Sequence, residues 1–271
     1  MKVRIAHAVL ACFGAALMLA APLAANAAEL STSGRAPKPG QFNPANETVE
    51  LFEGVKKGQL EVKMVHKDVA QGKVFITNKT DKPVNIKLPD AFVGVHVLAQ
   101  GMGGMGGGMG GMGGGGAQMS GGGMGGMGGG GGMGGAGGGG GGNFFNVAAE
   151  KVGEVPFVSV CLEHGKADPR AAMKYEMRSP ESIGMKPEVR ETIKLLADGK
   201  LTQRVAQVLA WHHQSEMSFE ELAAKSLKPL NGPEVPYFHP EEIQAAMQAK
   251  AYIAKQLEEK AQGSSTALPK L

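Results

Sequence analysis

The stretch from Gly101 to Gly142 reads GMGGMGGGMGGMGGGGAQMSGGGMGGMGGGGGMGGAGGGGGG, and the organisation of the whole chain depends on it. Thirty of its 42 residues are glycine and eight are methionine, and none is charged, aromatic or β-branched. Such a composition offers too little side-chain surface to offset the entropy that a glycine backbone loses on ordering. We call residues 101–142 the Gly/Met tract. Its composition predicts a disordered loop.

Four segments ahead of the tract alternate apolar and polar residues, as strands with one face in a core do. They cover residues 59–64, 73–77, 84–88 and 92–98. The polar run 78–83, between the second and third segments, predicts the turn of a hairpin. Before them, residues 46–58 predict a short helix that begins after Asn46 and ends at Gly58.

Two further apolar segments follow the tract, at residues 143–147 and 155–162. The strands on one side alone are too few for a β-sandwich, which usually has roughly seven, so we expect the tract to join two strands of one β-domain. A long loop closes at low cost, because each doubling of its length costs only about 0.6 kcal/mol. Deleting the tract is therefore expected to leave the fold nearly intact.

Helical patterns dominate the chain after Pro187. Thr202 suits a helix cap, and Ser218 with Glu221 suits a capping box. Strands followed by helices predict an α+β fold rather than alternating α/β units. We expect a flexible leader at 28–45, a β-domain at 46–165, a helical region at 166–262 and a disordered tail at 263–271.

The first 27 residues have the pattern of a cleaved signal peptide. Lys2 and Arg4 precede the apolar run 5–23, and Ala25–Ala27 supplies the small residues that mark the cleavage point. A membrane anchor is the alternative, but the run has only about 19 apolar residues and no basic stop follows it. We therefore expect an exported protein, periplasmic or secreted, with no membrane span after cleavage.

The charge balance argues against a nucleic-acid partner. The chain has 28 Lys and Arg residues against 25 Asp and Glu, and removing the signal peptide leaves a net charge near +1 with no basic cluster. Cys12 leaves with the signal peptide, so Cys161 alone remains and an intramolecular disulfide is excluded. The expected partner is an unknown envelope or extracellular protein.

Three stretches resemble a family of exported bacterial proteins of uncharacterised function. They are NKTDKPV at 78–84, VCLEHG at 160–165, and AWH at 210–212 followed by SFEEL at 218–222. The resemblance covers most of the chain after residue 47, and the family has a Gly-rich insert after a comparable strand. It implies a small immunoglobulin-like β-sandwich interrupted by the disordered tract, then a helical C-terminal region, and it implies no established activity.

Cys161, His164 and His212 are candidate metal ligands, because zinc and copper prefer thiolate and imidazole. The spacing of Cys161 and His164 could fill two positions of a tetrahedron, with His212 or His213 as a third ligand. No second pair has a recognised zinc spacing. The alternative interpretation is a core cysteine, a histidine satisfied at a turn and a histidine on a helix face.

Methionines of the tract form a second candidate metal site, since thioethers are soft ligands that suit Cu(I). The first four are Met102, Met105, Met109 and Met112. The alternative is a low-complexity expansion in which methionine is a tolerated interruption of polyglycine. Apart from copper or zinc, the sequence indicates no cofactor.

The same cysteine is the remote enzyme candidate, as the nucleophile of a Cys-dependent hydrolase. A catalytic thiol needs a depressed pKa, whereas Cys161 ends an apolar strand whose burial would keep it inert. The leading hypothesis is a non-enzymatic exported envelope protein that acts in protein interaction or structure. A copper- or zinc-binding exported protein is the alternative.

Overall fold

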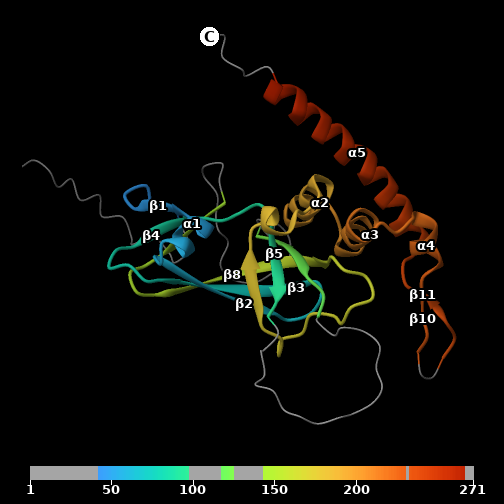
Figure 1. Ribbon diagram of the computed structural model, residues 1–271, viewed down its shortest axis with the longest axis horizontal. Helices are drawn as coiled ribbons and strands as arrows, with labels where there is room; N and C mark the ends of the chain where they lie inside the picture. The colour runs from blue at the N-terminus through green and yellow to red at the C-terminus, as the bar shows by residue number, and fades with distance from the viewer. Residues whose placement is uncertain (1–41, 98–116, 125–142, 230–231, 266–271) are drawn as a thin grey trace, which may run out of the picture. The chain divides into compact units, whose positions relative to one another are not determined.

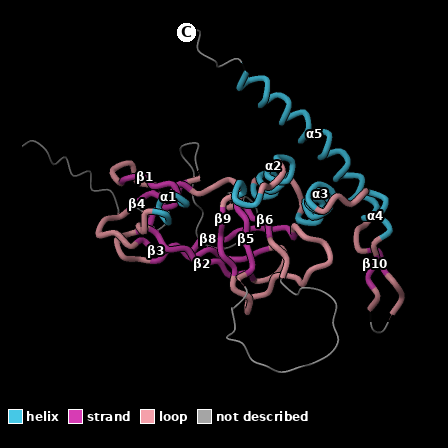
Figure 2. The backbone as a smooth tube through the Cα atoms, in the orientation of Figure 1, coloured by secondary structure: helices cyan, strands magenta, loops and turns pink. Residues whose placement is uncertain are grey.

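The chain is described by a computed structural model over residues 42–97, 117–124, 143–229 and 232–265, and residues 263–265 are described by their backbone alone. All described residues belong to one compact unit, Pro37–Leu271. Strands come first and helices follow, which confirms the α+β class (Figures 1 and 2). The predicted signal peptide, 1–27, lies outside the described residues, as do residues 28–41 of the predicted leader and 266–271 of the predicted tail. Residues 263–265 of the tail, which was predicted to be disordered, are helical.

Six strands close into a barrel in the order β2-β3-β8-β6-β5-β9. Their bounds are β2 Leu60–His66, β3 Gln71–Asn78, β8 Val152–Cys161, β6 Ser120–Gly123, β5 Phe92–His96 and β9 Tyr175–Arg178. A separate three-stranded sheet has the order β1-β4-β7, with β1 Glu47–Glu50, β4 Val84–Lys87 and β7 Phe144–Val147. The expected two-sheet immunoglobulin-like sandwich is therefore not formed. Closure leaves the barrel without free edges.

Strand β6 lies inside the Gly/Met tract and corrects its interpretation as a disordered loop. It pairs antiparallel with β5 on one side, Gly122 opposite Phe92, and with β8 on the other, Gly122 opposite Ser159. The interpretation is wrong for residues 117–124, and the rest of the tract lies outside the described residues. The composition of the tract predicted disorder here because the side chains and pairing strands that stabilise β6 belong to other parts of the chain.

The glycines of β6 are required by close packing. A Cβ on Gly122 would collide with the Phe92 ring inside the barrel. On the outer face, a Cβ on Gly121 would lie 2.5 Å from Ile193 Cδ1, and one on Gly123 would lie 2.7 Å from Ala197 Cβ. Helix α2, Pro187–Ala197, therefore packs directly on the backbone of β6.

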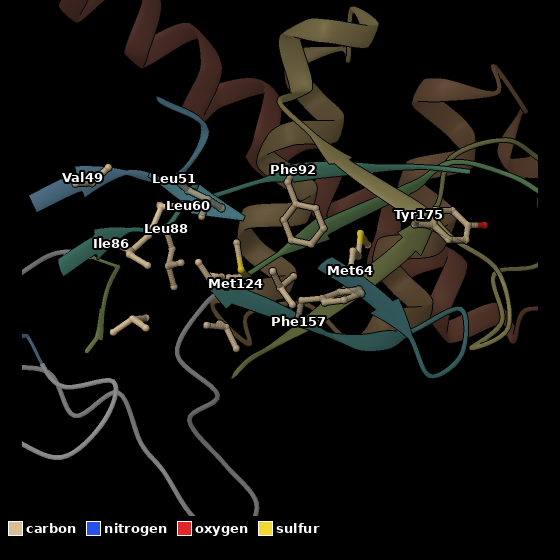
Figure 3. Close-up of a cluster of buried hydrophobic side chains, with 14 of the residues drawn as sticks. Val49, Leu51, Leu60, Met64, Ile86, Leu88, Phe92, Met124, Phe157 and Tyr175 are labelled. Atoms are coloured by element: carbon tan, nitrogen blue, oxygen red, sulfur yellow. The ribbon is translucent and has the colours of Figure 1, made fainter. Parts of the chain in front are cut away.

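Side chains fill the barrel, and Figure 3 shows Met64, Phe92, Phe157 and Tyr175 among its strands. Beyond α2, helix α3 (Gln203–Gln214) packs on β8, and α5 (Pro240–Ser265) packs on α3 and α2. Between them come α4, Phe219–Ala224, and a hairpin of β10, Ser226–Leu227, with β11, Val235–Pro236. The described part of the chain has no helix long and apolar enough to cross a membrane.

Local signals at helix ends were mostly reliable. Thr202 caps α3 and Ser218 forms the expected capping box with Glu221 on α4. The helix expected at 46–58 is shorter, because β1 occupies its first residues and α1, Leu51–Lys56, takes its cap from Glu50. Strand β9 and the 3₁₀ helix Pro180–Ile183 lie within residues 166–262, the region expected to be helical, and β9 belongs to the barrel.

Candidate functional site

The end of β8 is held by polar side chains of α3. The Gln207 amide accepts a hydrogen bond from Cys161 N and donates one to Cys161 O, both at 2.8 Å. Ser215, just after α3, donates to Leu162 O at 3.0 Å and accepts from His164 N at 3.2 Å. Gln207 is only 4 % exposed, so these hydrogen bonds form away from water. The amide thereby pairs the N–H and C=O of Cys161 as a neighbouring strand would.

A small cavity of about 80 Å³ lies where β8 meets α3. It is lined by Val69, Cys161, Asp168, Gln203, Arg204, Gln207, Tyr237 and Phe238. Arg204 donates to Glu242 Oε1 at 2.6 Å and to Tyr237 O, and its guanidinium lies over the Tyr237 and Phe238 rings. The cavity has room for a few water molecules. Its arginine already makes hydrogen bonds with Glu242 and Tyr237.

Cys161 is buried, as the sequence predicted. Burial raises the pKa of its thiol to about 12, and the nearby Asp168 carboxylate acts in the same direction. The thiol is therefore protonated at neutral pH, whereas both nucleophilic attack and metal binding need the thiolate. This site lacks the depressed thiol pKa that a cysteine nucleophile requires.

His164 packs in a cluster of aromatic and cationic side chains. Its ring meets Trp211 edge-on at 4.8 Å, and its Nε2 accepts from Lys225 Nζ at 2.9 Å. The same ammonium group lies over the rings of Trp211 and Tyr237. Burial and the Lys225 charge both lower the pKa of His164, which favours the neutral ring that accepts from Lys225.

His212, in the last turn of α3, has a similar arrangement. Its Nδ1 donates to Met217 O at 2.7 Å, which leaves Nε2 to accept from Lys250 Nζ at 2.9 Å. Its ring stacks on Phe219 with centroids 4.2 Å apart. Both predicted histidine ligands thus use Nε2 to accept from a lysine.

The predicted metal ligands do not come together as a site. Across the described residues, no three His, Cys, Asp or Glu side chains form a group that could hold a metal ion. Cys161 faces the small cavity, while His164 and His212 contact separate aromatic residues. Met102, Met105, Met109 and Met112 lie outside the described residues.

Sequence reasoning missed a buried pair inside the barrel. His66 Nε2 lies 2.9 Å from Ser120 Oγ, and both residues are completely buried. The pair resembles the serine and base of a hydrolase, but burial denies it a substrate and neither residue lines either of the two cavities described in this subsection. Two features of the sequence could have indicated this pair: His66 follows an alternating segment, and Ser120 carries the one hydroxyl group of the tract.

An apolar groove of about 310 Å³ lies where α4, β11 and α5 meet, and we call it the α4–α5 groove. It is lined by Ala223, Pro236, Phe238, Pro240, Ile243, Gln244 and Met247. Met247 is 49 % exposed, and Leu227 and Val235, paired across the adjoining hairpin, are also exposed. This part of the molecule presents apolar surface to its surroundings.

The chain matches no model of a known protein family, no curated protein and no solved structure. Its function is therefore inferred from the geometry of its own residues.

Proposed function

We propose that this chain is a non-enzymatic exported envelope protein that binds another protein through the α4–α5 groove. The observation that carries the proposal is the apolar lining of this groove beside a half-exposed methionine. Exposed apolar patches on folded proteins mark binding sites more often than chance. The export part of the proposal rests on the signal-peptide pattern of residues 1–27.

The groove suits an apolar side chain from an extended segment of the partner. Phe238 and Ile243 are buried in its lining and supply a rigid apolar surface. Met247 stands beside them, and methionine adapts its shape to different partners. The volume is at the lower end of what binding pockets have, enough for one or two large side chains.

Other parts of the molecule favour a binding role over catalysis. The barrel interior is filled by aromatic and aliphatic side chains, so it offers a scaffold rather than a ligand chamber. The thiol of Cys161 is protonated at neutral pH. The Ser120 and His66 pair is sealed from solvent.

A site-specific photocrosslinking experiment tests the proposal. With a photoreactive residue in place of Met247, cells that export the protein should yield a discrete adduct. The substitution Ala223→Glu should abolish the adduct, because it puts a charge into the groove. Ala224→Glu is the matched control, since Ala224 is exposed on the same helix but does not line the groove. Adducts that survive Ala223→Glu, or their absence from the wild-type groove, would contradict the proposal.

A further inference from the structure

Strand β6 is attached to the barrel mainly through its backbone. Three of its four residues are glycine, so only Ser120 contributes a side chain. Among the described residues, the single side-chain hydrogen bond of β6 joins Ser120 Oγ to His66 Nε2 on β2. The one bond that this strand makes with a side chain therefore ends on a titratable ring.

The His66 ring has nowhere to place a second proton. Its Nδ1 has no hydrogen-bond partner in the described part of the chain, and the residue is completely buried. Tyr175 of β9 and Phe157 of β8 pack against the ring, with centroids 4.4 and 5.2 Å away. A cation formed here would be an unpaired buried charge, which is costly.

The titratable groups around His66 do not offset this cost. Asp68, in the turn after β2, favours the protonated ring but makes no hydrogen bond to it. Tyr175 uses its hydroxyl to donate to Gln118 O, and His96 of β5 packs against the Tyr175 ring with centroids 5.4 Å apart. Cys161 of β8 is opposite Ser120 and holds a protonated thiol. Strand β3 places Gly72 opposite His66.

We propose that His66 and Ser120 form an acid-released latch that holds β6 in the barrel. Protonation of His66 favours any state in which the ring reaches water. Release of β6 is the smallest such opening, because its glycines give up little buried side-chain surface, whereas release of β9 would also expose Tyr175. The opening uncovers the hydrogen-bonding edges of β5 and β8, which are then free to pair with another strand.

The direction of the pH dependence follows from the burial of His66. Desolvation lowers the pKa of His66 from 6.5 to about 4 in the closed barrel. An open state with a solvated ring binds more protons between these values, so the closed state loses stability as pH falls through this range. Below about pH 4 the effect levels off, at roughly a 300-fold rise in the opening equilibrium.

Amide hydrogen exchange on the mature chain, corrected for the intrinsic pH effect, tests the latch. The amides of Gly121–Gly123 should open roughly 100-fold more at pH 4 than at pH 7. The variant His66→Gln keeps a hydrogen-bonding group but cannot titrate, and should remove this rise. His213→Gln is the matched control, because burial also lowers the pKa of His213 to about 4, but His213 lies on α3, outside the barrel. It should leave the rise unchanged.

Three results would overturn the latch. The first is an unchanged rise in His66→Gln. The second is equal opening of β9 or β3, which would indicate general acid unfolding. Should His66→Gln fail to fold, the imidazole of wild-type His66 is titrated by NMR beside the β6 amides. Different midpoints for the ring and the strand would be the third contradicting result.

Discussion

Strands β6 and β8 lie side by side in the barrel, yet their burial is encoded in opposite ways. Strand β8 carries its own apolar side chains, among them Phe157 and Val160, which fill the inside and outside of the barrel wall. Strand β6 is three glycines and a serine, and the space above its backbone is filled by Phe92 and Ile193 from other elements. A strand can thus be part of a core to which it contributes no apolar side chain.

The comparison predicts that, within the Gly/Met tract, only the part that forms β6 contributes strongly to the stability of the fold. Deleting residues 101–142 removes the strand between β5 and β8, so we expect a large fall in the melting temperature, in contrast to the expectation from the sequence alone. Deleting 125–141 should shift the melting temperature by only a few degrees, because the Asn143 side chain already donates to Met124 O at 2.6 Å and the new ends are adjacent. Circular dichroism melts measure both. A normal melt without the whole tract would show that β6 is dispensable.

Cys161 reports whether β6 is in place, because it is paired with Ser120 across β6 and β8. Burial raises its thiol pKa from 9.0 to about 12, so at pH 8 the thiolate is about a thousandfold scarcer than for an exposed cysteine. We expect native labelling by a thiol reagent to be slower than labelling in denaturant by at least that factor. Fast native labelling would mean that the end of β8 is open.

Adding side-chain volume to β6 should destabilise the barrel, because neighbouring side chains already fill the space above its glycines. Gly122→Val forces a collision with Phe92 inside the barrel and should cost about 3 kcal/mol of unfolding free energy. Gly123→Ala should cost more than Gly121→Ala. At Gly123 the obstacles are Ala197 Cβ and the Ile193 carbonyl, whereas at Gly121 the nearest atom is the movable end of Ile193. Denaturant titrations rank the three variants, and equal costs would contradict the packing explanation.

The end of β8 depends on Gln207 as β6 depends on its neighbours. Gln207→Leu leaves the buried N–H and C=O of Cys161 unpaired and should cost about 2 kcal/mol. Gln203→Leu is the control, since its single bond to Ser159 O is longer, at 3.4 Å, and should be worth about 0.5 kcal/mol. Urea unfolding compares them. Equal losses would mean that the paired bonds to Cys161 have no special weight.

The same contrast explains what the sequence could and could not predict. Strand β8 was found because residues 155–162 form a dense apolar segment, and α4 was found because Ser218 and Glu221 form a local capping box. Strand β6 was missed because the side chains that bury it lie far away in sequence. Strand β9 was missed because Pro169, Pro180 and Gly184 around it are typical of turns. Without either strand, six-strand closure could not be foreseen.

The candidate site shows the same division. The burial of Cys161 followed from its own apolar neighbours and was predicted correctly. The hydrogen bonds from Gln207 to Cys161 and from His66 to Ser120 join residues 46 and 54 positions apart, and no local pattern marks either pair. The α4–α5 groove likewise combines residues from three elements whose packing is not encoded locally.

The smallest predicted effect compares the two buried serines, Ser120 on β6 and Ser159 on β8. Each hydroxyl has one protein partner, His66 Nε2 for Ser120 and Val69 O for Ser159, both at 2.9 Å. Either substitution by alanine should cost about 1 kcal/mol. Only Ser120→Ala should selectively increase amide exchange of β6, by roughly fivefold, because β8 is retained by its other side chains. Equal local opening in both variants would mean that β6 is no more dependent on a single side-chain bond than β8 is.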